Sequence, residues 1–160
     1  MRLFRSSDIL GIAREAIAFA REAAENTHPN EYMGLLRGED AQTLGLSESG
    51  TVITEIHVIP GTESNPVSAT VQTSMIPNDR NAIGSIHSHP NGVLQPSDAD
   101  IASFGKGSVH IILGAPYGPD DWQAFDRQGD PTDLPVLDVE LPDEQFFDVT
   151  QEEIDKEMRR

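Results

Sequence analysis

The 160-residue chain contains no cysteine. Without thiols it can form neither a disulfide framework nor a thiolate zinc site, and it cannot work as a cysteine protease. A nucleobase deaminase in its usual form is excluded as well, because the Pro-Cys-x-x-Cys part of the deaminase zinc signature cannot occur. Any metal centre in this protein must therefore be built from histidine and oxygen ligands.

Long apolar runs are also missing. The first eight residues, Met1–Asp8, contain no apolar core of a signal peptide, and no stretch reaches the roughly 20 apolar residues of a membrane span. We therefore expect a soluble, cytoplasmic protein. The length fits a single domain over residues 1–160, which is large enough to form a core without covalent cross-links.

Positive charge is scarce. The chain has 27 acidic residues against 11 lysines and arginines, giving a formal net charge of −16, and only Lys106 and Lys156 are lysines. Such a chain repels nucleic acid and anionic membranes, so neither is expected as a partner. Molar salt shortens the Debye length to about 3 Å and screens the self-repulsion. The composition thus predicts a salt-loving archaeal source, with an acidic mesophilic protein as the alternative.

The most informative segment is His87-Ser88-His89. The residues before it, Ala82–Ile86, form a short apolar run, which favours a buried strand. On a strand, residues two apart point to the same face, so His87 and His89 are expected to project together. Two imidazoles on one face of a strand have the arrangement that two ligands of one metal ion need.

A third ligand is expected from a short helix. Pro96 precedes Ser97, which suits the N-cap position, and carboxylates in the first turn complement the helix dipole. The predicted helix, Ser97–Phe104, places Asp100 one turn in, where it could point back at the two histidines. Together they supply two nitrogens and one oxygen, and a catalytic zinc usually keeps three protein ligands. The same ligand set is compatible with several other divalent ions.

These spacings resemble the JAMM, or MPN+, metalloprotease motif, which reads His-[Ser/Thr]-His, seven residues, Ser, two residues and Asp. The family also has an upstream Glu, commonly in a Pro-x-Glu-aromatic-x-Gly-Leu-Leu context, and here the chain reads Pro29-Asn30-Glu31-Tyr32-Met33-Gly34-Leu35-Leu36. The resemblance extends from the first predicted helix to at least Asp126. It implies an α/β fold, the MPN (JAMM) domain, in which a curved mixed β-sheet is flanked by helices, resembling the cytidine-deaminase-like architecture.

By this resemblance, His87, His89 and Asp100 bind one zinc ion per chain. Glu31 is implied to be the general base that takes a proton from the attacking water, and Ser97 to donate a hydrogen bond to the oxyanion. The implied reaction is cleavage after the C-terminal glycine of ubiquitin-like modifiers, as in archaeal desampylases, so these modifiers and their conjugates are the expected partners. Conjugates of sulfur-carrier proteins are an alternative substrate, and a non-catalytic MPN scaffold is an alternative function.

Each of these residues also has an ordinary structural explanation. Ser97 is a good N-cap whatever chemistry it performs, Asp100 is typical of a first helical turn, and Glu31 could be a solvated residue before a strand. Such explanations fit the residues singly but not their joint occurrence. A structural zinc site is disfavoured because it would need a fourth protein ligand, and only three are apparent.

The rest of the chain is predicted to alternate helices and strands. A helix is expected over Asp8–Ala24, capped by Ser7 or Asp8. Strands are expected at Tyr32–Arg37, Ala41–Leu46, Thr51–Pro60, Val67–Gln72, Val109–Leu113, Asp121–Asp126 and Val136–Val139.

Neither the remaining histidines nor the aromatic residues are expected to take part in the site. His28 lies in a loop, His57 at a strand end, and His110 within an apolar strand where it is expected to be a satisfied core or rim residue. Trp122 and Phe125 are expected to pack in the core or at an edge.

Two loops are expected to contact the substrate. Gly61–Arg80 precedes the histidine strand, and Asn91–Gln95 separates His89 from Ser97. An extended tail is most economically held as an added strand, so Val67–Ser74 or Asn91–Gln95 is expected to help grip it.

The charge balance makes a prediction about stability. The free energy of unfolding, measured by titration with urea because urea adds no charge, should rise as NaCl is increased toward molar concentration. The physical reason is that salt screens the repulsion among the acidic groups. A stability that stays flat or falls over this range would favour the acidic mesophilic alternative.

Overall fold

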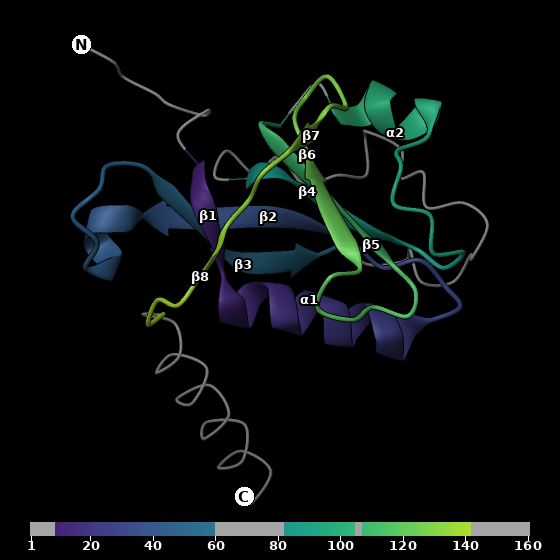
Figure 1. Ribbon diagram of the computed structural model, residues 1–160, viewed down its shortest axis with the longest axis horizontal. Coiled ribbons are helices and arrows are strands. Elements are labelled where there is room, and N and C mark those ends of the chain that lie inside the picture. The colour runs from purple at the N-terminus through teal and green to yellow at the C-terminus, as the bar shows by residue number, and fades with distance from the viewer. Residues whose placement is uncertain (1–8, 60–81, 105–106, 142–160) are drawn as a thin grey trace, which may run out of the picture.

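A computed structural model of the chain describes residues 9–59, 82–104 and 107–141. Within these ranges eight strands form one sheet in the order β7-β6-β5-β4-β2-β3-β1-β8, and the sheet is curved (Figure 1). The strands are β1 (Ile9–Ala13), β2 (Met33–Asp40), β3 (Thr51–Val58), β4 (Ala82–His89), β5 (Val109–Gly114), β6 (Trp122–Phe125), β7 (Pro131–Thr132) and β8 (Val136–Leu137). Strand β1 runs parallel to β3 and β8, and β4 runs parallel to β5, whereas β2 is antiparallel to both its neighbours. The sheet is therefore mixed, as predicted.

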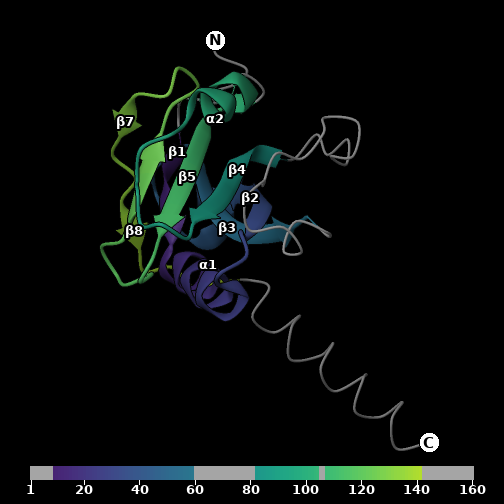
Figure 2. The ribbon, with the colours of Figure 1, turned by 90° about the vertical axis from the view of Figure 1, so that its right-hand side faces the viewer.

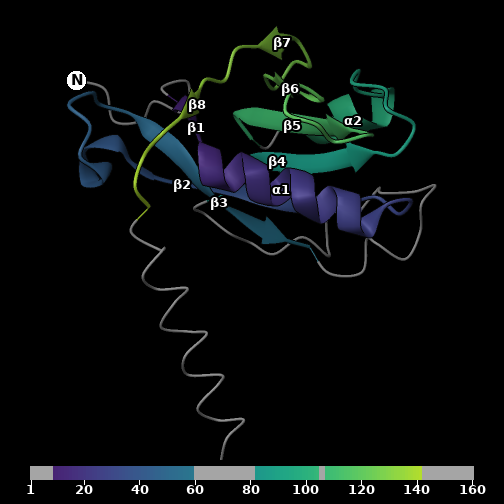
Figure 3. The same ribbon diagram turned by 60° about the horizontal axis from the view of Figure 1, so that its bottom comes forward.

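Two α-helices lie on opposite sides of this sheet (Figures 2 and 3). Helix α1 (Arg14–Thr27) follows β1 directly, and α2 (Asp98–Ser103) lies between β4 and β5 in the chain. A 3₁₀ helix, η1 (Ala41–Leu44), follows β2. In the described part of the chain no helix is long and apolar enough to cross a membrane.

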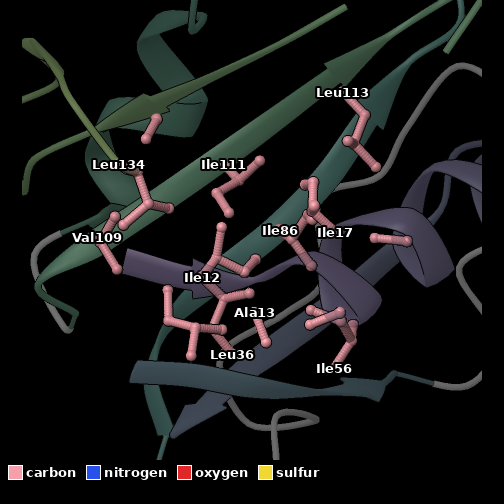
Figure 4. Close-up of a cluster of buried hydrophobic side chains, with 14 of the residues drawn as sticks. Ile12, Ala13, Ile17, Leu36, Ile56, Ile86, Val109, Ile111, Leu113 and Leu134 are labelled. Atoms are coloured by element: carbon pink, nitrogen blue, oxygen red, sulfur yellow. The ribbon is translucent and has the colours of Figure 1, made fainter. Parts of the chain in front are cut away.

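The main core fills the space between the sheet and α1. It includes residues from α1 and from the central strands, among them Ile17, Leu36, Ile86, Ile111 and Leu113 (Figure 4). A second, smaller core of Phe104, Ile112 and Phe125 lies on the α2 side. Because side chains alternate along a strand, burying Ile86 and Ile111 against α1 turns their neighbours His87 and Ile112 toward α2.

The prediction for the first helix is wrong at its start. The segment Ile9–Ala13 is strand β1, which pairs with β3 and β8, and the helix begins only at Arg14. Its N-cap is Ala13, which makes no side-chain capping hydrogen bond. The helix then runs to Thr27, beyond the predicted end at Ala24. The caps proposed for it, Ser7 and Asp8, lie outside the described residues.

A second correction concerns Ala41–Leu46, which does not form a strand. The Asp40 carboxylate accepts a hydrogen bond from the Gln42 backbone N–H at 2.8 Å and caps the 3₁₀ helix. Gly45 then ends it in the left-handed conformation, with φ of 87°. Local side-chain capping therefore overrides the strand propensity of this short segment.

The other strand predictions that fall on described residues are confirmed. Tyr32–Arg37, Thr51–Pro60, Val109–Leu113, Asp121–Asp126 and Val136–Val139 correspond to β2, β3, β5, β6 and β8. Strand β7 was not predicted. Val67–Gln72, and the whole of the proposed substrate loop Gly61–Arg80, lie outside the described residues. Phe125 is buried and Trp122 is half-buried beside the main core, in line with their expected packing roles.

The contact between β4 and β5 makes a prediction. A Cβ atom at Gly84 would overlap the carbonyl oxygen of Val109, so Gly84→Ala must push the two strands apart. We expect it to lower the free energy of unfolding by about 3 kcal/mol or more, at the upper end for overpacking. Denaturant titration measures this loss.

The matched control is Gly45→Ala, because a Cβ atom there meets nothing within 4 Å. The same substitution at Gly45 incurs only the strain of its left-handed backbone, about 1–2 kcal/mol. Equal losses in the two variants would show that the β4–β5 contact is not the tight one described.

Candidate metal centre

The two histidines of β4 lie at the centre of the sheet. Strand β4 pairs with β2 on one side and with β5 on the other, where His87 is opposite Ile112 and His89 is opposite Gly114. The His87 side chain is buried and that of His89 is partly exposed. Both project to the α2 side of the sheet, as the two-residue period of a strand predicts.

His87, His89 and Asp100 bring one ligand atom each to a single point. The two imidazole Nε2 atoms are 3.1 Å apart. The Asp100 carboxylate approaches with Oδ1 at 3.3 Å from Nε2 of His87 and Oδ2 at 3.2 Å from Nε2 of His89. Atoms that surround a tetrahedral zinc ion at its usual bond lengths are separated by about 3.3 Å. The contact between the two imidazole nitrogens, and that of each nitrogen with its carboxylate oxygen, are therefore close to the spacing of neighbouring zinc ligands, and one donor atom from each residue lies within 4.8 Å of the other two.

A backbone carbonyl fixes the tautomer of His89. Its Nδ1 donates a hydrogen bond to the carbonyl oxygen of Val93 at 2.8 Å, and a carbonyl can only accept. The proton of the neutral ring is thus on Nδ1, and the lone pair of Nε2 faces His87 and Asp100. Metal-binding histidines are commonly oriented in this way by a partner of their second nitrogen.

The N-terminus of α2 holds Asp100 in place through a capping box. The Ser97 hydroxyl oxygen accepts a hydrogen bond from the Asp100 backbone N–H at 3.0 Å. In return, the Ser97 backbone N–H donates a hydrogen bond to Asp100 Oδ2 at 2.8 Å. The prediction that Ser97 caps this helix is confirmed. The same contacts that start the helix also orient the carboxylate toward the two histidines.

The electrostatics of the cluster favour a charged carboxylate. Burial opposes ionisation of Asp100, but its contacts with His87 and His89, whose rings can donate to the carboxylate when they are protonated, together with the hydrogen bond from the Ser97 backbone N–H, outweigh it and lower its pKa well below the usual range. Burial likewise lowers the pKa of His89, yet the hydrogen bonds to Asp100 and to the Val93 carbonyl raise it overall. In this pair the carboxylate supplies the negative charge that a cation would neutralise.

Glu31 lies beside this cluster. Its neighbour Tyr32 is tied to Ser88 in both directions, because the Tyr32 N–H donates to Ser88 Oγ at 2.8 Å and the Ser88 N–H donates to the Tyr32 carbonyl at 2.9 Å. This extends the β2–β4 pairing and sets Glu31 level with His89. Burial raises the pKa of Glu31, and the nearby charges of His87 and His89 lower it in part.

Ser97 has a hydrogen-bonding capacity that the cap does not use. Its side chain is exposed, and its oxygen accepts the Asp100 N–H. No acceptor for the Ser97 O–H is found among the described residues, so this proton can be donated to a bound group.

The remaining histidines stay outside the cluster. In the ranges that the structure describes, only His87, His89 and Asp100 form a group of three possible ligands. His28 contacts the Tyr117 hydroxyl at 2.7 Å through Nδ1, His57 is exposed on β3, and His110 is buried. The Val93 carbonyl is a supporting group that sequence reasoning missed, since a backbone atom leaves no residue-type signal.

Comparisons with known proteins identify the family of this chain. A family model described as prokaryotic homologues of the JAB domain matches residues 13–128. A Haloferax volcanii protein that carries the name probable metalloprotease is 61% identical over 161 residues, which cover 100% of both chains.

Solved structures show the same fold. One is described as JAMM, a metalloprotease-like zinc site in the proteasome and signalosome. It is 27% identical with a TM-score of 0.60, and the match covers 81% of this chain and 99% of that one. A JAB1/MPN domain protein from Archaeoglobus fulgidus is 25% identical with a TM-score of 0.59, over 80% and 99% of the two chains. Because the family model spans most of the chain and the sequence relative matches it throughout, this chain belongs to the JAMM/MPN family, among the prokaryotic homologues of the JAB domain.

Proposed function

We propose that this chain is a zinc-dependent isopeptidase that cleaves after the C-terminal glycine of ubiquitin-like modifiers. The observation that supports it most is the cluster of His87, His89 and Asp100, in which each imidazole Nε2 lies 3.1–3.3 Å from the other and from an oxygen of the carboxylate, with Glu31 beside it. A structural zinc site would close all four positions with protein ligands, whereas three are gathered in the described part of this chain. The open side is where water and substrate would enter.

One zinc ion per chain is the metal we infer. Two imidazole nitrogens and one carboxylate oxygen are ligands that zinc accepts, and the donor spacing fits its tetrahedral geometry. When bound, zinc lowers the pKa of a water molecule to about 7 and polarises a carbonyl group.

Glu31 would move the proton in this reaction. Its carboxylate is close enough to interact electrostatically with His87, His89 and Asp100, and it is not one of the three clustered ligands. A carboxylate oxygen of Glu31 can accept a proton from the attacking water and return it to the leaving amine. Because burial raises its pKa, the carboxyl group of Glu31 is a better proton acceptor than an exposed glutamate.

Ser97 would stabilise the oxyanion that forms at the scissile carbonyl. Its oxygen is fixed by the Asp100 N–H, so the O–H proton is directed away from the cap. Such donors usually contribute about 100- to 1000-fold to the rate of acyl transfer.

The substrate tail would lie along the loop Asn91–Gln95 rather than add to the histidine strand. Strand β4 is already hydrogen-bonded on both edges, to β2 and β5, so an added strand cannot pair with it. The Val93 side chain is 47% exposed, although its carbonyl is bonded to His89. It offers an apolar contact close to the metal centre for an extended peptide.

Two other functions remain as alternatives to this proposal. Conjugates of sulfur-carrier proteins would also be joined through a C-terminal glycine, and the same site could cleave them. A non-catalytic scaffold of this fold would be expected to lack some of the catalytic set, whereas Glu31, His87, His89, Ser97 and Asp100 are all present.

Zinc should stabilise the protein. With free zinc at about 100 times its dissociation constant, binding to the folded state adds about 2.7 kcal/mol. For a domain of this size, that raises the melting temperature by about 5–10 °C. His89→Ala should abolish the shift, while His57→Ala, which removes an exposed imidazole on β3, should keep it. A shift that survives His89→Ala would mean that zinc binds elsewhere.

Glu31 should be required for cleavage of the substrate but not for the binding of zinc. The substrate is a ubiquitin-like protein joined through its C-terminal glycine to a lysine side chain. We expect Glu31→Gln to retain zinc and to lower kcat by about 100- to 10,000-fold, the usual range for a lost general base. Glu22→Gln, on the exposed side of α1, is the matched control and should cleave normally.

Three results would contradict parts of this proposal. Full activity in Glu31→Gln would show that the base is wrongly assigned. Cleavage that continues after chelation would exclude the zinc mechanism. If the zinc-loaded wild-type protein cleaves neither modifier conjugates nor sulfur-carrier conjugates, the scaffold function is favoured.

A further inference from the structure

His110 is a buried histidine that the proposed reaction does not use. It lies on β5, and 3% of its surface is exposed. Its Nδ1 is 2.7 Å from Ser85 Oγ, and its Nε2 is 2.9 Å from the carbonyl oxygen of Phe104. One imidazole therefore joins three elements: β5, the strand β4, and the end of α2.

The two hydrogen bonds define the state of the ring. A carbonyl oxygen can only accept, so Nε2 of His110 carries the proton and donates it to Phe104. Nδ1 then accepts the Ser85 hydroxyl proton. Ser85 precedes His87 by two residues on β4 and shares its face, so this bond anchors the imidazole to the strand of the metal ligands.

Among the described residues, helix α2 has few other attachments to the sheet. It is six residues long and none of its own residues is buried, and a helix this short is marginal by itself. Its C-cap residue, Phe104, is fully buried and stacks on the His110 ring, with centroids 4.1 Å apart and planes within 4°. On the outer side, Ile101 packs against the turn at Gly129.

The His110 imidazole is closely surrounded by neighbouring groups. A Cβ atom at Gly107 would come within 2.9 Å of His110 Cε1 and 2.8 Å of the Gly84 Cα. The absence of a side chain at Gly107 therefore leaves the room that the ring occupies. His110 is therefore held in one orientation, with Phe104 against its face.

We propose that His110 is a positioning residue for the metal centre, fixing α2, which carries Asp100, at a set distance from β4, which carries His87 and His89. The inference rests on the proposed function of these three residues as metal ligands. A zinc site tolerates little error in donor spacing, so a helix that can shift by a fraction of an ångström binds the ion less well.

Zinc affinity in His110→Phe tests this role. Phenylalanine keeps a buried ring that can stack on Phe104 and removes both hydrogen bonds. We expect the dissociation constant for zinc, measured by competition with a chromophoric chelator, to rise by about 10- to 100-fold, as is typical when a supporting group around a metal site is lost. The far-ultraviolet circular dichroism spectrum verifies that the variant is folded.

Two further variants separate the two hydrogen bonds. Ser85→Ala removes only the bond to β4 and should weaken zinc binding less than His110→Phe. His110→Gln carries an amide donor and an amide acceptor, and it should recover part of the affinity. These variants also keep the test valid if His110→Phe does not fold.

The control is Ile111→Ala, at the next residue of β5 on the opposite face. Ile111 is fully buried in the main core, so its truncation destabilises the fold by leaving a cavity, without touching α2. The folded variant should bind zinc as tightly as the wild type. If His110→Phe weakens zinc binding no more than Ile111→Ala does, the positioning role is overturned. If the wild-type protein itself binds no zinc, the proposed function fails and this inference fails with it.

Discussion

The pairing of β4 with both of its neighbours is the constraint on which the rest of the structure depends. Ile86 must point into the main core, and the alternation of a strand then turns His87 to the other face. The antiparallel pairing with β2 brings Glu31 level with His89, and the parallel pairing with β5 places His110 beside Ser85. One set of backbone hydrogen bonds therefore fixes the core, the candidate metal ligands and the proposed base together.

In helix α2, too, one set of contacts has both a structural role and a role at the candidate metal centre. The capping box between Ser97 and Asp100 satisfies backbone groups at the start of the helix and, with the same atoms, aims the carboxylate at the histidines. The contacts with His87 and His89 and the hydrogen bond from the Ser97 backbone N–H lower the pKa of Asp100, so the helix presents a charged carboxylate to the sheet. Helix α2 buries none of its own residues, yet it can hold Asp100 in place because both of its ends are anchored. The capping box holds the first end, and the contacts of Phe104 with His110 hold the second.

Local patterns in the sequence predicted the cluster of candidate ligands, whereas the features that the sequence did not predict depend on pairing between segments that lie far apart in the chain. The histidine strand and the Ser97 cap obey rules that act within a few residues, and both are confirmed. Ile9–Ala13 was assigned to a helix because its partners, in β3 and β8, lie far away in the chain, although Gly11 in its middle is unfavourable in a helix. Glu31 could be placed only by family resemblance, since its position follows from the β2–β4 register.

The hydrogen bonds of the two ring nitrogens distinguish His89 from His110 in their capacity to bind a metal ion. In His89 the Nδ1 N–H donates a hydrogen bond to the Val93 carbonyl, which leaves the Nε2 lone pair facing Asp100. In His110 both nitrogens are occupied, one by Ser85 and the other by the Phe104 carbonyl, so no lone pair is left for an ion. Two histidines on adjacent strands and on the same face of the sheet thus have different capacities, because of hydrogen bonds that residue type alone does not reveal.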